Sequence, residues 1–149
     1  MRQPPRDDGT AIIEFVFVAV ILMVPLVYFL VAVSAIQGAA VAASQAAREA
    51  GRAFATAPST QVAYDRAQLA VTLALSDEGL TTAPAVTFVA AGDSCNGRAV
   101  TPALDPGSEF AACVRLRVAI PGVPRILAGR GITETGRYVV HVDDFRTAR

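Results

Sequence analysis

The hydrophobic pattern of the chain is dominated by one uninterrupted apolar run near its N-terminus. No charged residue occurs from Phe15 to Ile36. An α-helix needs about 20 apolar residues to cross the roughly 30 Å hydrocarbon core of a bilayer. The run therefore predicts a membrane-spanning helix. Its single proline, Pro25, is expected to kink or locally unwind that helix.

The helical pattern continues beyond the apolar run. Gln37 to Phe54 is rich in alanine, the strongest helix former, and contains no proline. The two parts together predict one rod, on the order of 65 Å long at 1.5 Å per residue. Residues 10–56 are therefore expected to form a transmembrane and stalk helix, about half of which stands outside the lipid.

Small residues recur every three or four positions along this rod, so they collect on one side of it. They are Ala32, Ala35, Ala39, Ala42 or Ala43, Ala46 and Ala50, with Ser34 and Gly38 nearby. A face of this kind lets membrane helices approach closely and predicts packing of the rod against similar helices. The alternative is that alanine is merely abundant in this chain.

The pattern after the rod predicts a small domain over residues 57–149. A break at Thr56 to Thr60 precedes a helical pattern that ends at Gly79. One face of that second helix carries Val62, Leu69 and Leu73. Three further segments have the composition or alternation of strands: Ala85 to Ala90, Ala111 to Ile120 and Arg137 to Val142.

These elements define the expected fold class. It is α+β, in which a long N-terminal transmembrane helix continues into a small extracytoplasmic domain. That domain is expected to contain one amphipathic helix and a three- to four-stranded antiparallel sheet. With 149 residues in all, the chain has room for one such domain beyond the helix and not for two.

The charge distribution excludes one class of partner. The formal net charge is zero, and the positive charges are all arginine, spread along the chain without a cluster. A nucleic-acid-binding domain normally carries a basic patch or stripe. We therefore expect no DNA or RNA partner.

Two cysteines lie in the part that is predicted to project from the membrane. An even pair, Cys95 and Cys113, on an extracytoplasmic face indicates a disulfide. Such a bridge would tie the Gly- and Pro-containing loop Gly92 to Gly107 to the second predicted strand. Two free, partly buried thiols are the alternative.

The residues show no persuasive active site. His141 is the single histidine, and it is flanked by valines in a predicted strand. Asp143 and Asp144 follow it, but no nucleophile motif such as G-x-S-x-G accompanies them. No second histidine and no cysteine cluster provides metal-ligand spacing. The chain is therefore not expected to be an enzyme or to hold a metal or cofactor.

The residues before the apolar run are polar and predict a leader, residues 1–9. If the chain is cut after Gly9, Thr10 becomes the new N-terminus and Glu14 lies one helical turn away. A carboxylate in lipid is costly unless it is paired, so an α-amino group of the same or a neighbouring chain is its expected partner. One alternative is an uncleaved helix with Glu14 in the headgroup region, and another is secretory cleavage at Val33-Ser34-Ala35.

The segment Gly9-Thr-Ala-Ile-Ile-Glu14-Phe15, placed directly before the uncharged run, resembles the prepilin processing site of type IV pilin-like proteins of the Flp/Tad group. The Glu14-Phe15 pair, the single proline and the continuation Ala46-Ala-Arg48-Glu-Ala-Gly51-Arg52-Ala together resemble the TadE-like pilus assembly proteins. The resemblance covers about the first 55 residues. In one departure from the pattern, Asp7 and Asp8 precede Gly9 in place of a lysine or an arginine pair.

The resemblance implies a function and a set of partners. It implies cleavage between Gly9 and Thr10 by a membrane aspartyl prepilin peptidase, and a role for Glu14 and Phe15 in assembly. The chain would then be a minor pilin or pseudopilin of a Tad pilus. Its partners would be that peptidase, other pilin-like subunits, the Tad assembly machinery and the lipid bilayer.

The resemblance also implies a location. The arginines before and after the apolar run are balanced, so the positive-inside rule leaves orientation open. The resemblance favours a single-pass protein of the plasma (inner) membrane, N-terminus inside and C-terminal domain extracytoplasmic, that enters a pilus or reaches the cell surface. The competing hypothesis is an uncleaved single-pass membrane protein whose distal domain serves in binding or scaffolding.

Overall fold

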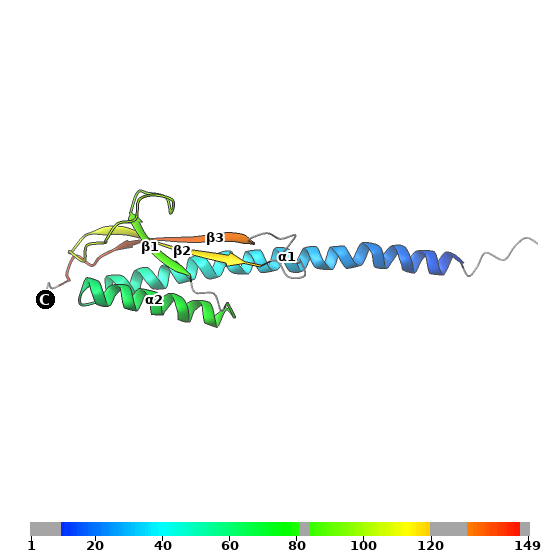
Figure 1. The fold of residues 1–149 in the computed structure, drawn as a ribbon, viewed down its shortest axis with the longest axis horizontal. Coiled ribbons are helices and arrows are strands. Elements are labelled where there is room, and N and C mark those ends of the chain that lie inside the picture. The colour runs from blue at the N-terminus through cyan, green and yellow to red at the C-terminus, as the bar shows by residue number, and fades with distance from the viewer. Residues whose placement is uncertain (1–9, 81–83, 120–130, 147–149) are drawn as a thin grey trace, which may run out of the picture.

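The structure, a computed structural model, describes residues 10–80, 84–119 and 131–146. Within these ranges it contains two helices and three strands: α1 (Thr10–Ala55), α2 (Thr60–Asp77), β1 (Ala85–Ala90), β2 (Glu109–Val118) and β3 (Ile132–His141). Figure 1 shows α1 as a long rod whose N-terminal half extends alone, while its C-terminal half lies between α2 and the sheet. The predicted α+β class is confirmed, and we call α2, the sheet and the adjoining half of α1 the head.

The local unwinding that was one predicted effect of Pro25 does not occur. α1 is helical at Pro25 and on both sides of it. A proline inside a helix removes one backbone hydrogen bond, and a long helix can accommodate that loss without ending. The rod predicted from the sequence is therefore a single continuous helix.

The three strands form an antiparallel sheet in the order β1-β2-β3. The central strand β2 pairs with both neighbours, so that Ala112 lies opposite Phe88 on one side and Tyr138 on the other. One face of β2 packs toward the helices through Phe110, Ala112, Val114 and Leu116, all of them buried. This is the alternation expected of a strand with one covered face.

The predicted strand boundaries need correction. β1 has the predicted bounds, but β2 lies two residues earlier than predicted, and Ile120 is outside the described residues. β3 begins at Ile132, five residues before the predicted Arg137, and ends at His141. The sequence hid this extension because Gly136 weakens a strand pattern. Pairing with β2 extends the strand through it nevertheless.

The C-terminal half of α1 is the centre of the head's core. Its buried residues are Ala39, Ala42, Ala43, Ala46, Ala47, Ala50 and Phe54. All of them except Ala39 pack with the inner face of the sheet and with α2 in one cluster. The prediction that Ala39 to Ala50 form a surface for packing against other helices is therefore wrong. The same small side chains instead let the chain's own sheet and second helix approach the rod.

Two glycines allow this close approach. A Cβ atom at Gly51 of α1 would overlap the side chain of Val140 and come within 3.2 Å of Tyr138, both on β3. A Cβ atom at Gly136 of β3 would overlap the backbone of Ala43 on α1. At Gly136 strand and helix thus touch backbone to backbone, and at Gly51 side chains of the strand reach the helix backbone, which only residues without a side chain permit.

An aromatic cluster closes the distal end of the core. Phe54 of α1 lies 4.5 Å from Phe88 of β1 and 5.2 Å from both Tyr64 of α2 and Phe110 of β2, measured between ring centroids. Aromatic rings at these separations attract each other beyond their burial. The cluster therefore joins both helices to two of the strands.

The predicted buried face of α2 is wrong for Leu69 and Leu73, although Val62 packs against the core. The buried residues are Ala63, Ala67, Val71 and Leu75, one helical turn apart, whereas Leu69 and Leu73 are 59% and 55% exposed. This face of α2 packs with the alanine-lined surface of α1 in one core cluster. The bounds of α2 come close to the prediction. Ser59 caps its first turn, and Gly79, with φ +72°, follows its end.

Candidate membrane and assembly site

The N-terminal half of α1 presents an apolar surface that no other described part of the chain covers. The large apolar side chains from Ile12 to Val31 are all about half exposed or more. At 1.5 Å per residue this stretch is about 30 Å long, the thickness of a hydrocarbon core. By length and composition, α1 is therefore a helix that could cross a membrane.

Residues of the predicted processing site lie at the start of this surface. α1 begins at Thr10, and Glu14 and Phe15 follow within its first turns; Phe15 is 74% exposed. Gly9 and the rest of the predicted leader lie outside the described residues. Glu14 is the single charged residue of α1 before Arg48. A carboxylate in this position would stand at the edge of the hydrocarbon if α1 crosses a bilayer.

The two cysteines lie in the head, far along the chain from that site. The structure joins Cys95 and Cys113 in a disulfide, with Cα atoms 5.7 Å apart, which is the pairing that the sequence predicted. Cys113 belongs to the outer face of β2, and with Val89 and Ala111 it forms a small second cluster that Cys95 covers. The bridge therefore holds the loop after β1 against the outer face of the sheet.

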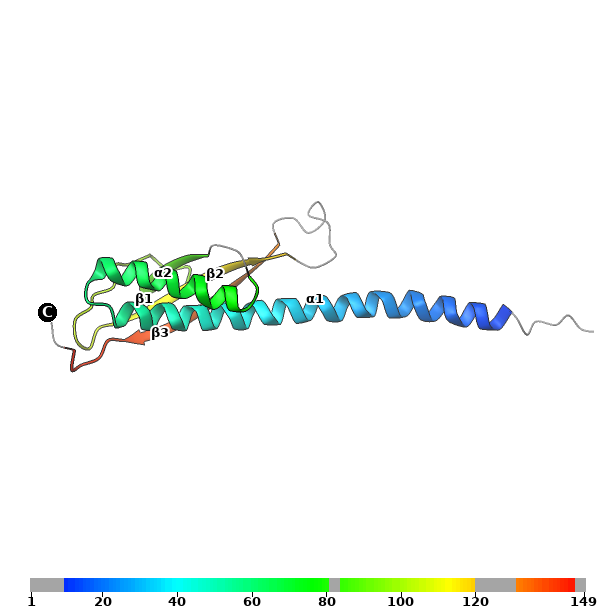
Figure 2. The same ribbon diagram turned by 90° about the horizontal axis from the view of Figure 1, so that it is seen from below.

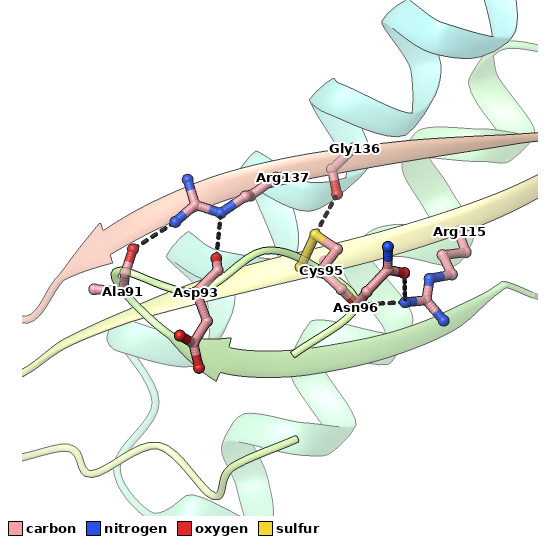
Figure 3. Close-up of a disulfide and its surroundings, with 8 residues drawn as sticks. Ala91, Asp93, Cys95, Asn96, Arg115, Gly136 and Arg137 are labelled. Atoms are coloured by element: carbon pink, nitrogen blue, oxygen red, sulfur yellow. Dashed lines mark hydrogen bonds between the residues drawn. A yellow bond between two sulfur atoms is a disulfide. The ribbon is translucent and has the colours of Figure 1, made fainter. Parts of the chain in front are cut away.

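Two arginines hold the same loop, as Figure 3 shows. Arg137 of β3 donates hydrogen bonds to the carbonyl oxygens of Ala91 and Asp93. Arg115 of β2 donates to the carbonyl oxygen of Cys95 and, at 3.0 Å, to the Asn96 side chain. Hydrogen bonds from a charged donor are stronger than neutral ones. The sequence alone did not reveal this role for either arginine.

No family model, curated protein or solved structure matches the chain. Its function is therefore inferred from its own residues and geometry.

The candidate acid–base residues form an open surface cluster at the distal end of the sheet. His141 Nδ1 lies 3.4 Å from Glu109 Oε1, and His141 Nε2 lies 3.4 Å from Asp144 Oδ1. These carboxylates, Asp144 first, raise the pKa of His141 above 6.5. The contact with Glu109 was missed from the sequence, although antiparallel pairing places Glu109 directly opposite His141. The three side chains are more than half exposed.

The described residues also contain no group of three or more His, Cys, Asp and Glu side chains placed to hold a metal ion. The features with structural support are thus the exposed apolar half of α1, with Glu14 near its start, and the head, whose outer loop is held by a disulfide and two arginines. The apolar half of α1 can act in lipid or between helices, and the head projects beyond that half.

Proposed function

We propose that the chain is a minor pilin or pseudopilin that takes part in assembly of a Tad (Flp-type) pilus. On this proposal a prepilin peptidase cuts after Gly9, and the mature chain begins at Thr10. The protein sits in the plasma (inner) membrane with its N-terminus inside and its head extracytoplasmic. From there its N-terminal helix enters an assembly of other pilin-like subunits.

The observation that carries the proposal is the division of α1 into two surfaces. Its C-terminal half is buried in the head, while its N-terminal half, from Ile12 to Val31, is apolar and uncovered. A subunit that moves from lipid into a helical bundle needs such a surface, since apolar side chains suit both lipid and neighbouring helices. Packing between subunits is therefore assigned to Ile12–Val31, and not to the alanines that the head already covers.

Glu14 supports the same proposal. After cleavage, the α-amino group of Thr10 would lie one helical turn from the Glu14 side chain. A carboxylate at the edge of the hydrocarbon is stabilised by a cation, which either its own or a neighbouring N-terminus supplies. Pairing with a neighbour would set the register between subunits. Phe15, on the exposed surface beside it, would pack in the same contact.

The first experiment is to determine the N-terminal residue of the protein recovered from membranes. A start at Thr10 is the expected result. An intact Met1 would overturn processing and leave the competing hypothesis, an uncleaved single-pass protein with an extracytoplasmic binding or scaffolding head. A start after Ala35 would mean secretory cleavage and loss of the anchor.

The second experiment tests the assigned role of Glu14. Glu14→Ala is expected to leave cleavage and membrane insertion intact while reducing piliation. Glu49→Ala is the matched control, because Glu49 lies on the same helix, is exposed and stands outside the apolar stretch. Normal piliation with Glu14→Ala would remove the assigned role, and an equal defect with Glu49→Ala would show a general effect of charge loss.

A further inference from the structure

An open pocket of mixed polar and apolar lining lies on the outer face of the sheet, beside the loop that the disulfide holds. Its volume is about 740 Å³. The polar side chains that line it are Arg115 and Arg117 of β2, Thr133 and Thr135 of β3, and Asn96 of the loop. No carboxylate is among the described residues that line it. Two guanidinium groups with hydroxyl and amide donors suit an anionic, oxygen-rich group such as a phosphate.

The pocket residues are positioned by regular secondary structure. Arg115 lies directly opposite Thr135, and Arg117 directly opposite Thr133, in the antiparallel register of β2 and β3. Side chains at directly opposite positions have Cβ atoms about 5 Å apart. Arg115 is also fixed by its hydrogen bonds to Cys95 and Asn96. The result is a row of two arginine–threonine pairs along the sheet.

This row lies at the end of the head nearest the apolar half of α1. β3 runs in the same direction as α1, because Gly136 touches Ala43 whereas Val140, further along, touches Gly51. Residues of β3 before Gly136 therefore lie toward the N-terminal half of α1. Figure 2 shows the two strands extending toward the N-terminal half of α1 while they diverge from the helix.

The depth of the pocket follows from the rise per residue of strand and helix. Thr133 precedes Gly136 by about 10 Å of strand, which corresponds to about seven residues of helix before Ala43. Thr133 and Arg117 thus lie level with about Ile36. If the hydrocarbon ends at Val31, Ile36 stands about 7 Å above it, within the headgroup layer of the bilayer.

We propose that this pocket binds the phosphate of an anionic phospholipid headgroup in the leaflet next to the head. The proposal rests on the membrane anchoring that is part of the proposed function. Arg117 contacts the headgroup phosphate, and the hydroxyl groups of Thr133 and Thr135 donate hydrogen bonds to it. Arg115, through its hydrogen bonds to the loop, keeps the side of the pocket in place. Binding fixes the head against the membrane surface before the subunit leaves the bilayer.

The test uses the full chain in lipid nanodiscs of phosphatidylcholine alone, or of an equal mixture of phosphatidylcholine and phosphatidylglycerol. The backbone amide resonances of Arg117, Thr133 and Thr135 are expected to shift only with phosphatidylglycerol. Arg117→Gln should weaken this lipid preference about fivefold, since one arginine near an anionic surface contributes about that much. Arg66→Gln is the matched control: Arg66 is an exposed arginine on α2, beside Ala55 and Phe145 at the distal end.

The outcomes separate this proposal from the proposed function. Inorganic phosphate and glycerol phosphate are added to the phosphatidylcholine nanodiscs. If they cause the same Arg117-dependent shifts, the site takes a soluble anion and the lipid assignment is overturned. Exchange protection of the amides from Ile12 to Val31 reports insertion of α1. Insertion without a phosphatidylglycerol effect overturns the pocket alone, whereas failure to insert overturns both the anchor and the pocket's ligand.

Discussion

Gly136 of β3 lies directly against the backbone of Ala43 on α1, so closely that a Cβ atom at position 136 would overlap the Ala43 carbonyl oxygen. This contact, together with the one between Gly51 and Val140, fixes the direction and spacing of β3 on the helix. It therefore decides which end of the sheet faces the apolar half of α1.

Gly136→Ala is expected to lower the free energy of unfolding of the head by about 3 kcal/mol, because the added methyl group must displace backbone and not a flexible side chain. Gly92→Ala is the control, since a Cβ atom there meets nothing within 4 Å. Its effect should stay within about 0.5 kcal/mol. Chemical denaturation followed by circular dichroism measures both. Equal stabilities for the two variants would mean that β3 does not touch α1 at this point.

The disulfide is expected to stabilise the head mainly by reducing the number of conformations that the unfolded chain can adopt. The two cysteines are 18 residues apart. A loop of this length corresponds to about 3 kcal/mol in the chain-entropy model. Reduction, or the double variant Cys95→Ala/Cys113→Ala, should lower the unfolding free energy by about that amount. The double variant should itself be insensitive to reductant. Alkylation of two thiols in the unreduced protein would contradict the bridge.

The two faces of α2 are expected to respond differently to the same substitution. Leu75 is fully buried and Leu73 is 55% exposed, so they form a matched pair on one helix. Leu75→Ala should cost about 3 kcal/mol through lost burial and a residual cavity. Leu73→Ala should change the stability by less than about 1 kcal/mol. A larger loss of stability for Leu73→Ala than for Leu75→Ala would mean that Leu73 lies on the buried face, as the sequence pattern predicted.

The stability of the head is expected to depend on the protonation of His141, which lies beside Asp144 and Glu109. The hydrogen bonds from His141 to Asp144 and then Glu109 raise its pKa in the folded state, so they favour the protonated ring. Their contribution to stability is therefore fully present below pH 6.5 and is lost as the pH rises through the raised pKa. A nuclear magnetic resonance titration of the ring should give a value above 6.5, which Asp144→Asn lowers more than Glu109→Gln does. Because the cluster is exposed, added salt should reduce the shift.

A large part of the fold could be predicted from local pattern. The length of the apolar run, the alanine-rich continuation and the break at Pro58 predict α1 and α2, because helix propensity and proline act locally. β1 and the alternating part of β2 were likewise visible as strand patterns. The cysteine pair also needed no structure beyond its count and its place in the chain.

The candidate site also has one part that the sequence predicts and another that depends on the fold. The apolar stretch with Glu14 near its start can be read directly from the order of residues. In contrast, the contact of Glu109 with His141 and the row of Arg115, Arg117, Thr133 and Thr135 depend on the register of β2 and β3. Register is a long-range property, so residues far apart in the chain become neighbours only once the strands pair.

The sequence by itself thus determined that this protein has one long helix with an apolar N-terminal half, followed by a small α+β unit. Only the tertiary structure decided which surfaces remain available. The alanines of α1 suit packing against any close neighbour, and the chain's own sheet and second helix fill that place because Gly51 and Gly136 let them approach. The same contact buried the face of α2 that carries Ala63, Ala67, Val71 and Leu75, and it left Leu69 and Leu73 exposed.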